Sequence, residues 1–188
     1  FYIKGVASTE LVDRVKSRTK DHCFYACPTP DGFSGIALAG EVKEYAFTNE
    51  PLSITGSSPK SQGKNYHRTD EQSKKESAEF FSDSASRPMH KELASQPYSP
   101  LVTIMTADFI LQAQDLTGCP GKFPELSYDN LIRRTFDFLT KSTFHNEVLV
   151  RELNIVKKIA EQHGQVELFN QLLTKTKRKV VWDKPVYG

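Results

Sequence analysis

The sequence predicts an α/β fold in its first part, followed by a mainly helical remainder. Residues 42–48 alternate between apolar and polar side chains, and residues 52–55 form a second short run of strand-forming residues. A run of small residues at 33–39 precedes both and favours a short helix that Gly40 ends. From Ser99 onward, apolar residues recur at helical spacing between capping residues. Strands and helices are therefore expected at the start, and helices alone at the end.

The segments before residue 42 predict two more strands and one more helix. The chain begins inside an expected strand at residues 1–4, and residues 21–27 predict a short buried strand. A helix over residues 10–18 lies between them, with Ser8 or Thr9 as its N-cap. Pro28 and Pro30 then prevent a helix until Asp31, whose side chain can cap the helix at 33–39.

Residues 28–63 contain the candidate functional residues. Asp31 is an isolated carboxylate at a junction between a loop and a helix, which is a place for a general base. A Gly/Ser loop at residues 56–63 carries Lys60, and such a loop can direct several N–H groups at an anion. The alternative interpretation is an ordinary turn, a packed helix and a polar surface loop.

A series of short motifs runs through this region in a defined order. They are Gly-Val-Ala-Ser at 5–8, Leu-Val-Asp-Arg-Val-Lys at 11–16, Pro-Asp-Gly-Phe-Ser-Gly-Ile-Ala-Leu-Ala at 30–39, Tyr-Ala-Phe at 45–47 and Glu-Pro-Leu-Ser-Ile-Thr-Gly-Ser-Ser-Pro-Lys-Ser-Gln-Gly at 50–63. This order resembles the later part of bacterial family 2 glycosyltransferases of GT-A fold. That family has a pattern like Pro-Asp-x-Tyr-Ser-x-x-Ala-Leu, followed by a strand and a Gly-x-Ser-x-x-Ser-x-Gly loop. Phe33 stands where the family often has tyrosine.

The resemblance implies the C-terminal part of a GT-A-like fold and an inverting glycosyltransferase. A nucleotide-sugar donor would pass its sugar to a saccharide or lipid-linked acceptor of a cell-surface polysaccharide or glycoconjugate. Asp31 would be the catalytic base, and the ligand-binding residues would be Ser34, Gly56, Ser57, Ser58, Lys60 and Ser61. The sequence has no Asp-x-Asp motif, so the family's Mn²⁺ or Mg²⁺ would be bound by residues outside this chain.

Composition and cysteine spacing bear on three other functional classes: nucleic-acid binding, membrane insertion and metal binding. The 188 residues carry a net charge of +2, which is too small to give the strong positive potential that attracts nucleic acid. No apolar run approaches the roughly twenty residues of a membrane helix, and a cytoplasmic location is expected. Cys23 and Cys27 lack a second pair of ligands, so they predict idle or buried thiols and no metal site.

The remaining chain predicts one long loop and a series of helices. Residues 56–72 are rich in Ser, Gly and charged residues and predict a mobile loop. The expected helices are a short one within 71–84 and longer ones at about 99–116, 127–141, 146–163 and 165–177. The longer ones open at Ser99, with Pro100 in the first turn, at Ser127 and at Asn146 or Glu147, and Gly164 ends the helix at 146–163.

Three regions follow from this order: residues 1–72 as the acceptor-side catalytic part, 73–124 as a connecting helical segment and 125–188 as a helical region. The alternative to an enzyme is a non-catalytic helical interaction domain that binds a partner protein or an anionic membrane surface. The basic run at 175–179 would provide peripheral membrane contact, and the helical tail would provide a homo-oligomer interface. A solvated helix end is the simpler interpretation of the basic run.

Overall fold

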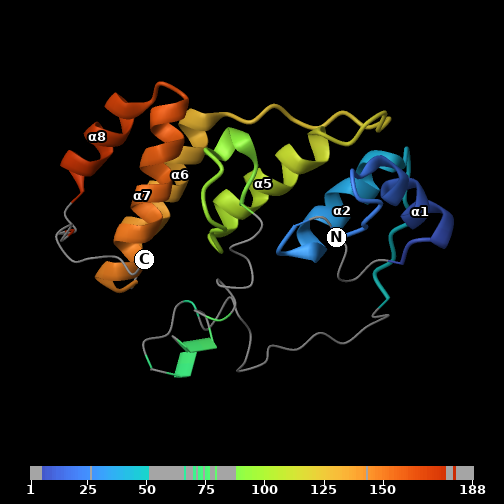
Figure 1. Ribbon diagram of the computed structural model, residues 1–188, viewed down its shortest axis with the longest axis horizontal. Coiled ribbons are helices and arrows are strands. Elements are labelled where there is room, and N and C mark those ends of the chain that lie inside the picture. Colours follow the sequence, from blue (N-terminus) through green and yellow to red (C-terminus); the bar gives the residue numbers. More distant parts are fainter. Residues whose placement is uncertain are drawn as a thin grey trace. The chain divides into compact units, whose positions relative to one another are not determined.

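The computed structural model describes residues 6–25, 27–50, 66, 70, 72, 73, 75, 76, 79, 88–142, 144–176 and 180. Every regular element in this part of the chain is helical (Figure 1). The elements are α1 (Thr9–Arg18), α2 (Pro30–Glu41), the 3₁₀ turn η2 (Lys91–Leu93), α5 (Val102–Gln114), α6 (Tyr128–Lys141), α7 (Asn146–Gln162) and α8 (Val166–Lys175).

The α/β prediction, and with it the GT-A-like fold, is wrong for the described residues, which contain no strand. Residues 21–25 and 27 form turns, bends and irregular backbone, with His22 at a φ of 49°, in place of the expected buried strand. Residues 42–48 form no ladder within the described chain. Alternation makes a segment able to form a strand, but a strand also needs a neighbour to bond. The strands expected at 1–4 and 52–55 lie outside the described residues.

The chain divides into two compact units, each built from two stretches of sequence. The first unit contains Phe1–Ser58 and Asp108–Glu125, and the second contains Pro59–Ala107 and Leu126–Gly188. Helix α5 contributes to both, because the division falls between Ala107 and Asp108.

The first unit is built on the packing of α1 against α2. Val15 from α1 and Phe33 and Ala37 from α2 are almost fully buried. A Cβ built on Gly32 would lie 1.9 Å from the ring of Phe109, so this ring packs directly on the backbone of α2. The small residues of α2 thus admit a helix–helix contact.

The C-terminal end of α2 is held by an ion-pair cluster. The buried carboxylate of Glu41 pairs with the guanidinium of Arg18, and Arg14 Nε lies 3.8 Å from Glu41 Oε2. Arg18 also donates through Nη1 to the carbonyl oxygens of Thr117 and Gly118. One side chain therefore joins α1, the end of α2 and the loop that follows α5.

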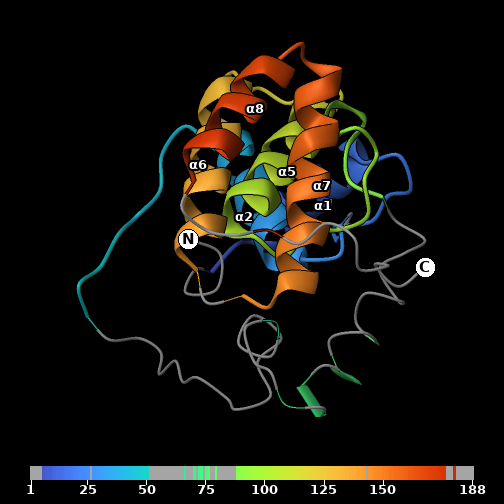
Figure 2. The same ribbon diagram turned by 90° about the vertical axis from the view of Figure 1, so that its left-hand side faces the viewer.

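The second unit is a helical bundle in which α6, α7 and α8 pack side by side (Figure 2). Phe136 of α6 and Phe169 of α8 meet edge to face, with ring centroids 5.9 Å apart. The core contains large apolar side chains at helical spacing: Leu131, Ile132 and Leu139 of α6, Leu149, Leu153, Val156 and Ile159 of α7, and Leu168 of α8. The 3₁₀ turn η2 packs against α7.

Several predicted helix ends are confirmed. Ser8 accepts a hydrogen bond from the Leu11 amide, and Ser127 accepts one from the Asn130 amide. Gly164 has a φ of 66°, and the Gln165 amide donates to the Ala160 carbonyl, so α7 ends in a Schellman motif. By contrast, α5 begins at Val102, three residues after Ser99.

None of the described helices is both long enough and apolar enough to cross a bilayer.

Candidate functional site

Asp31 lies in the first turn of α2, at the second helical position. Pro30 occupies the first position and Thr29 the N-cap position, without a side-chain capping bond. The expected cap by Asp31 is therefore wrong, because a proline tolerates the first helical position and α2 starts one residue earlier than expected. The carboxylate remains partly exposed at the positive end of the helix dipole.

Ser34, one turn further along α2, is fully buried. Its hydroxyl donates to the Pro30 carbonyl oxygen at 2.7 Å, which is a bond within the same helix. This placement directs the hydroxyl at the backbone of its own helix, and the ligand-binding role of Ser34 stays a prediction. The other expected ligand residues lie outside the described residues: Gly56, Ser57, Ser58, Lys60 and Ser61.

The thiol of Cys27 lies immediately before α2 and is buried. The pKa of this thiol is raised to about 12, chiefly by burial and also by the negative charges of Asp108 and Asp31, although hydrogen bonds with the backbone lower it. Its Sγ donates to the Thr29 carbonyl oxygen at 3.3 Å. Cys27 is therefore a protonated, unreactive thiol that lies near two carboxylates.

Asp108 is the residue of this cluster that the sequence interpretation missed. It lies on α5 and is almost completely buried, in a helix that was interpreted only as an apolar core face. The available signal was its position: Asp108 is the only charged residue in α5. A buried charged residue is uncommon without a partner or a role.

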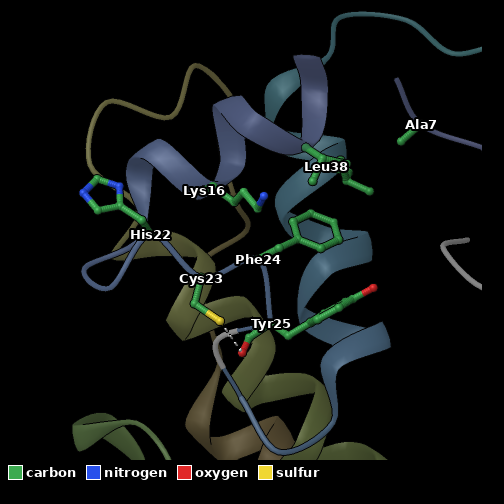
Figure 3. A pocket seen from close by; sticks show the side chains of 8 residues that line it. Ala7, Lys16, His22, Cys23, Phe24, Tyr25 and Leu38 are labelled. Carbon is green, nitrogen blue, oxygen red and sulfur yellow. Dashed lines mark hydrogen bonds between the residues drawn. The ribbon is translucent and has the colours of Figure 1, made fainter. Parts of the chain in front are cut away.

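A separate pocket of about 580 Å³ lies between α1, α2 and the turns of residues 22–25 (Figure 3). Phe24 and Leu38 lie together in it, whereas the imidazole of His22 points away from them. The exposed Cys23 thiol donates to the Tyr25 carbonyl oxygen at 3.4 Å. Neither Asp31 nor Ser34 lines this pocket, so the two features of the first unit are distinct.

The second unit contains a buried polar cluster around Glu152. This fully buried carboxylate pairs with Arg151, accepts a bond from the Tyr66 hydroxyl and accepts one from Ser99 Oγ at 2.6 Å. Arg151 Nη2 also donates to the Tyr98 carbonyl oxygen at 2.7 Å. Burial raises the pKa of Tyr66, and the Glu152 charge raises it further. Both Glu152 oxygens have partners, which is typical of a structural cluster.

Within the described part of the chain, no three His, Cys, Asp or Glu side chains come together to hold a metal ion. The resemblance places its divalent cation on residues outside this chain, and that stays a prediction.

No protein-family model, no curated protein and no solved structure matches this chain.

Proposed function

We propose that this chain supplies the acceptor side of a sugar-transfer reaction, with Asp31 as the general base. The observation that carries the proposal is the place of Asp31, a partly exposed carboxylate in the first turn of a helix made of small residues. The same residue is the aspartate of the Pro-Asp-x-x-Ser pattern that resembles family 2 glycosyltransferases. The sequence pattern and the exposure of the carboxylate both support the choice of Asp31.

The setting of Asp31 suits proton transfer. A base must be fixed within hydrogen-bond reach of an acceptor hydroxyl, and α2 is fixed at both ends. The Phe109 ring packs on Gly32 beside Asp31, and the ion pairs of Glu41 hold the far end. The carboxylate would take the hydroxyl proton as the oxygen attacks the anomeric carbon of a nucleotide sugar and the nucleoside diphosphate leaves, with inversion. We assign no step to a metal ion in this chain.

Turnover of Asp31→Asn tests this role in a protein that carries a donor-binding half together with this chain. The amide keeps the size of the side chain but cannot accept the proton, so turnover at saturating donor and acceptor should fall about a hundredfold or more. Asp13→Asn is the matched control, because Asp13 is an exposed aspartate of α1 in the same unit. Normal turnover of Asp31→Asn would remove Asp31 from the mechanism.

A non-catalytic interaction domain is the second candidate. The wholly helical character of the described elements and the apolar pocket of the first unit support it. Peripheral contact with anionic lipid through residues 175–179 and a cytoplasmic location stay predictions, since most of that basic run lies outside the described residues.

The two candidates differ in their response to nucleotide sugars. An interaction domain should give no transfer with UDP-, GDP- or dTDP-sugars, whatever half is joined to it. In both cases we expect no calorimetric signal for nucleotide sugars with this chain alone, because the donor site would lie elsewhere. Micromolar binding by the chain itself would contradict the acceptor-side assignment.

A further inference from the structure

The pocket of the first unit lies between α1, α2 and the turns that connect them. Helix α1 contributes Val12 and Lys16, which are four residues apart and therefore share one face of the helix. Helix α2 contributes Leu38, and residues 22–25 form a further wall. The volume of about 580 Å³ is that of an ordinary small-molecule site.

The base of this pocket is apolar. Phe24 and Leu38 are almost fully buried and lie together in Figure 3. The ring of Phe24 also meets the ring of Tyr25, with centroids 4.9 Å apart and a tilt of 58°. Tyr25 itself is exposed, so the aromatic wall continues from the base to the rim. Such a wall gains free energy when an apolar ligand displaces water from it.

A single cation stands beside these apolar walls. Among the described residues that line the pocket, Lys16 is the only lysine, arginine, aspartate or glutamate. Its side chain is 45% exposed and lies on the same side as the ring of Phe24 in Figure 3. A lysine in this position covers apolar surface with its methylene groups and keeps its ammonium group in water. The imidazole of His22 points away from the base.

The ion pair that Lys16 makes in the described chain is a weak one. Lys16 Nζ lies 3.4 Å from Asp13 Oδ1, and the side chain of Asp13 is 70% exposed. Pairs between exposed side chains on one helix contribute little to stability, because water solvates both charges well. The ammonium group can therefore exchange Asp13 for the carboxylate of a ligand at little cost.

We propose that this pocket binds a medium-chain aliphatic carboxylate. The hydrocarbon chain lies against Phe24 and Leu38, and the carboxylate pairs with the ammonium group of Lys16 at the rim. The apolar walls select against a wholly polar ligand, and one ammonium group matches one negative charge. A phosphate monoester carries up to two charges and three acceptor oxygens, which is more than one lysine satisfies.

This site is independent of the proposed sugar transfer, because neither Asp31 nor Ser34 lines the pocket. Failure of Asp31 as a base would leave it unaffected.

Calorimetric titration of the whole chain with octanoate and with octan-1-ol gives the first test. The two probes have the same chain length, and only octanoate is charged at pH 8. We expect octanoate to bind with a dissociation constant on the order of 0.1–1 mM and octan-1-ol to bind about fivefold more weakly. Equal affinities would show that the pocket does not recognise the carboxylate. No binding of either probe at millimolar concentration would overturn the whole proposal.

Charge variants test the role of Lys16. Lys16→Gln keeps much of the side chain but loses the charge, so it should weaken octanoate binding about fivefold and leave octan-1-ol binding unchanged. Asp13→Asn removes the competing carboxylate and should strengthen octanoate binding. Lys20→Gln is the matched control, because Lys20 is an exposed lysine of the same unit outside the pocket. A Lys16→Gln protein that still prefers octanoate over octan-1-ol would overturn the assignment of Lys16.

A filling variant tests the location of the site. Val12 lines the pocket and is only partly buried, so the larger ring of Val12→Trp can occupy the pocket without displacing the core. It should weaken the binding of both probes about equally. Val166→Trp, at a partly exposed valine of α8, is the control and should change neither affinity. Unchanged binding to a Val12→Trp protein with native far-UV helicity would place the ligand elsewhere and overturn the proposal.

Discussion

The hydroxyl of Ser99 donates a hydrogen bond of 2.6 Å to Glu152 Oε2, and this bond links the chain just before α5 to the middle of α7. Ser99 is fully buried and its Oγ also accepts from the Leu101 amide. With Arg151 and Tyr66 on the other carboxylate oxygen, Glu152 has partners on both sides. A carboxylate in this position stabilises the second unit only while all of its partners are present.

We therefore expect Glu152→Ala to lower the free energy of unfolding by about 3–5 kcal/mol, because it leaves Arg151, Ser99 and Tyr66 without their acceptor. Urea unfolding followed by circular dichroism measures the loss. Glu161→Ala on the same helix is the control: Glu161 pairs with exposed Lys157 and Lys158, and its loss should cost less than about 1 kcal/mol. A Glu152→Ala loss as small as that of Glu161→Ala would show that the cluster contributes little.

Tyr66 should make the chain sensitive to alkali. Its pKa is raised by burial and by Glu152, so the folded state holds the phenolic proton more tightly than the unfolded state does. Retaining this proton therefore stabilises the folded state. The stabilisation is complete below the ordinary tyrosine pKa of about 10 and decreases as the pH rises above it. Unfolding free energies of wild type and Tyr66→Phe, measured from pH 8 to 11, should show the steeper decline in wild type. Parallel curves would contradict a buried, protonated Tyr66.

The loop after α5 should tolerate no side chain at Gly121. A Cβ there would lie 2.6 Å from both the Cα and the carbonyl oxygen of Gly40, which are backbone atoms of α2 that cannot rotate away. Gly121→Ala should cost about 1–3 kcal/mol, the usual range for an overpacked core. The midpoint of urea unfolding measures this cost. A Gly121→Ala protein as stable as wild type would mean that the loop does not pack on Gly40.

Local signals in the sequence predicted the helices better than the fold class. Ser127 with its following apolar face identified α6, and Gly164 identified the end of α7, because caps and spacing act within a few residues. The alternation at residues 42–48 is equally local, but a sheet depends on a neighbouring strand that no short pattern specifies. The strand prediction for residues 21–27 was wrong for a related reason, because aromatic side chains suit a pocket wall as well as a strand.

The candidate site was predictable only in part. The sequence placed Asp31 at the start of a helix, which the structure confirms, although Pro30 moves the start and removes the capping role. Cys27 and Asp108 lie close enough to interact electrostatically, although they are 81 positions apart along the chain. Contacts of this kind depend on how α5 packs against α2, as the Phe109 ring on Gly32 shows. No spacing rule within one helix contains that information.

The three free thiols should differ sharply in reactivity. Cys23 is exposed, so alkylation by iodoacetamide at pH 8 should modify it first. Cys119 is half-buried, and burial raises its pKa, so it should follow more slowly. Cys27 is buried with a pKa raised to about 12, which leaves roughly one thiolate in ten thousand at pH 8. It should therefore react far more slowly than the other two thiols.

Peptide mass spectrometry over a time course measures the three rates separately. Urea above the unfolding midpoint is the control, because the three thiols should then react at similar rates. In the Asp108→Asn variant, loss of a nearby negative charge should lower the pKa of Cys27 and speed its alkylation, while the rate at Cys23 stays unchanged. If Cys27 of the native chain were alkylated as fast as Cys23, the burial of the Cys27 thiol would be wrong.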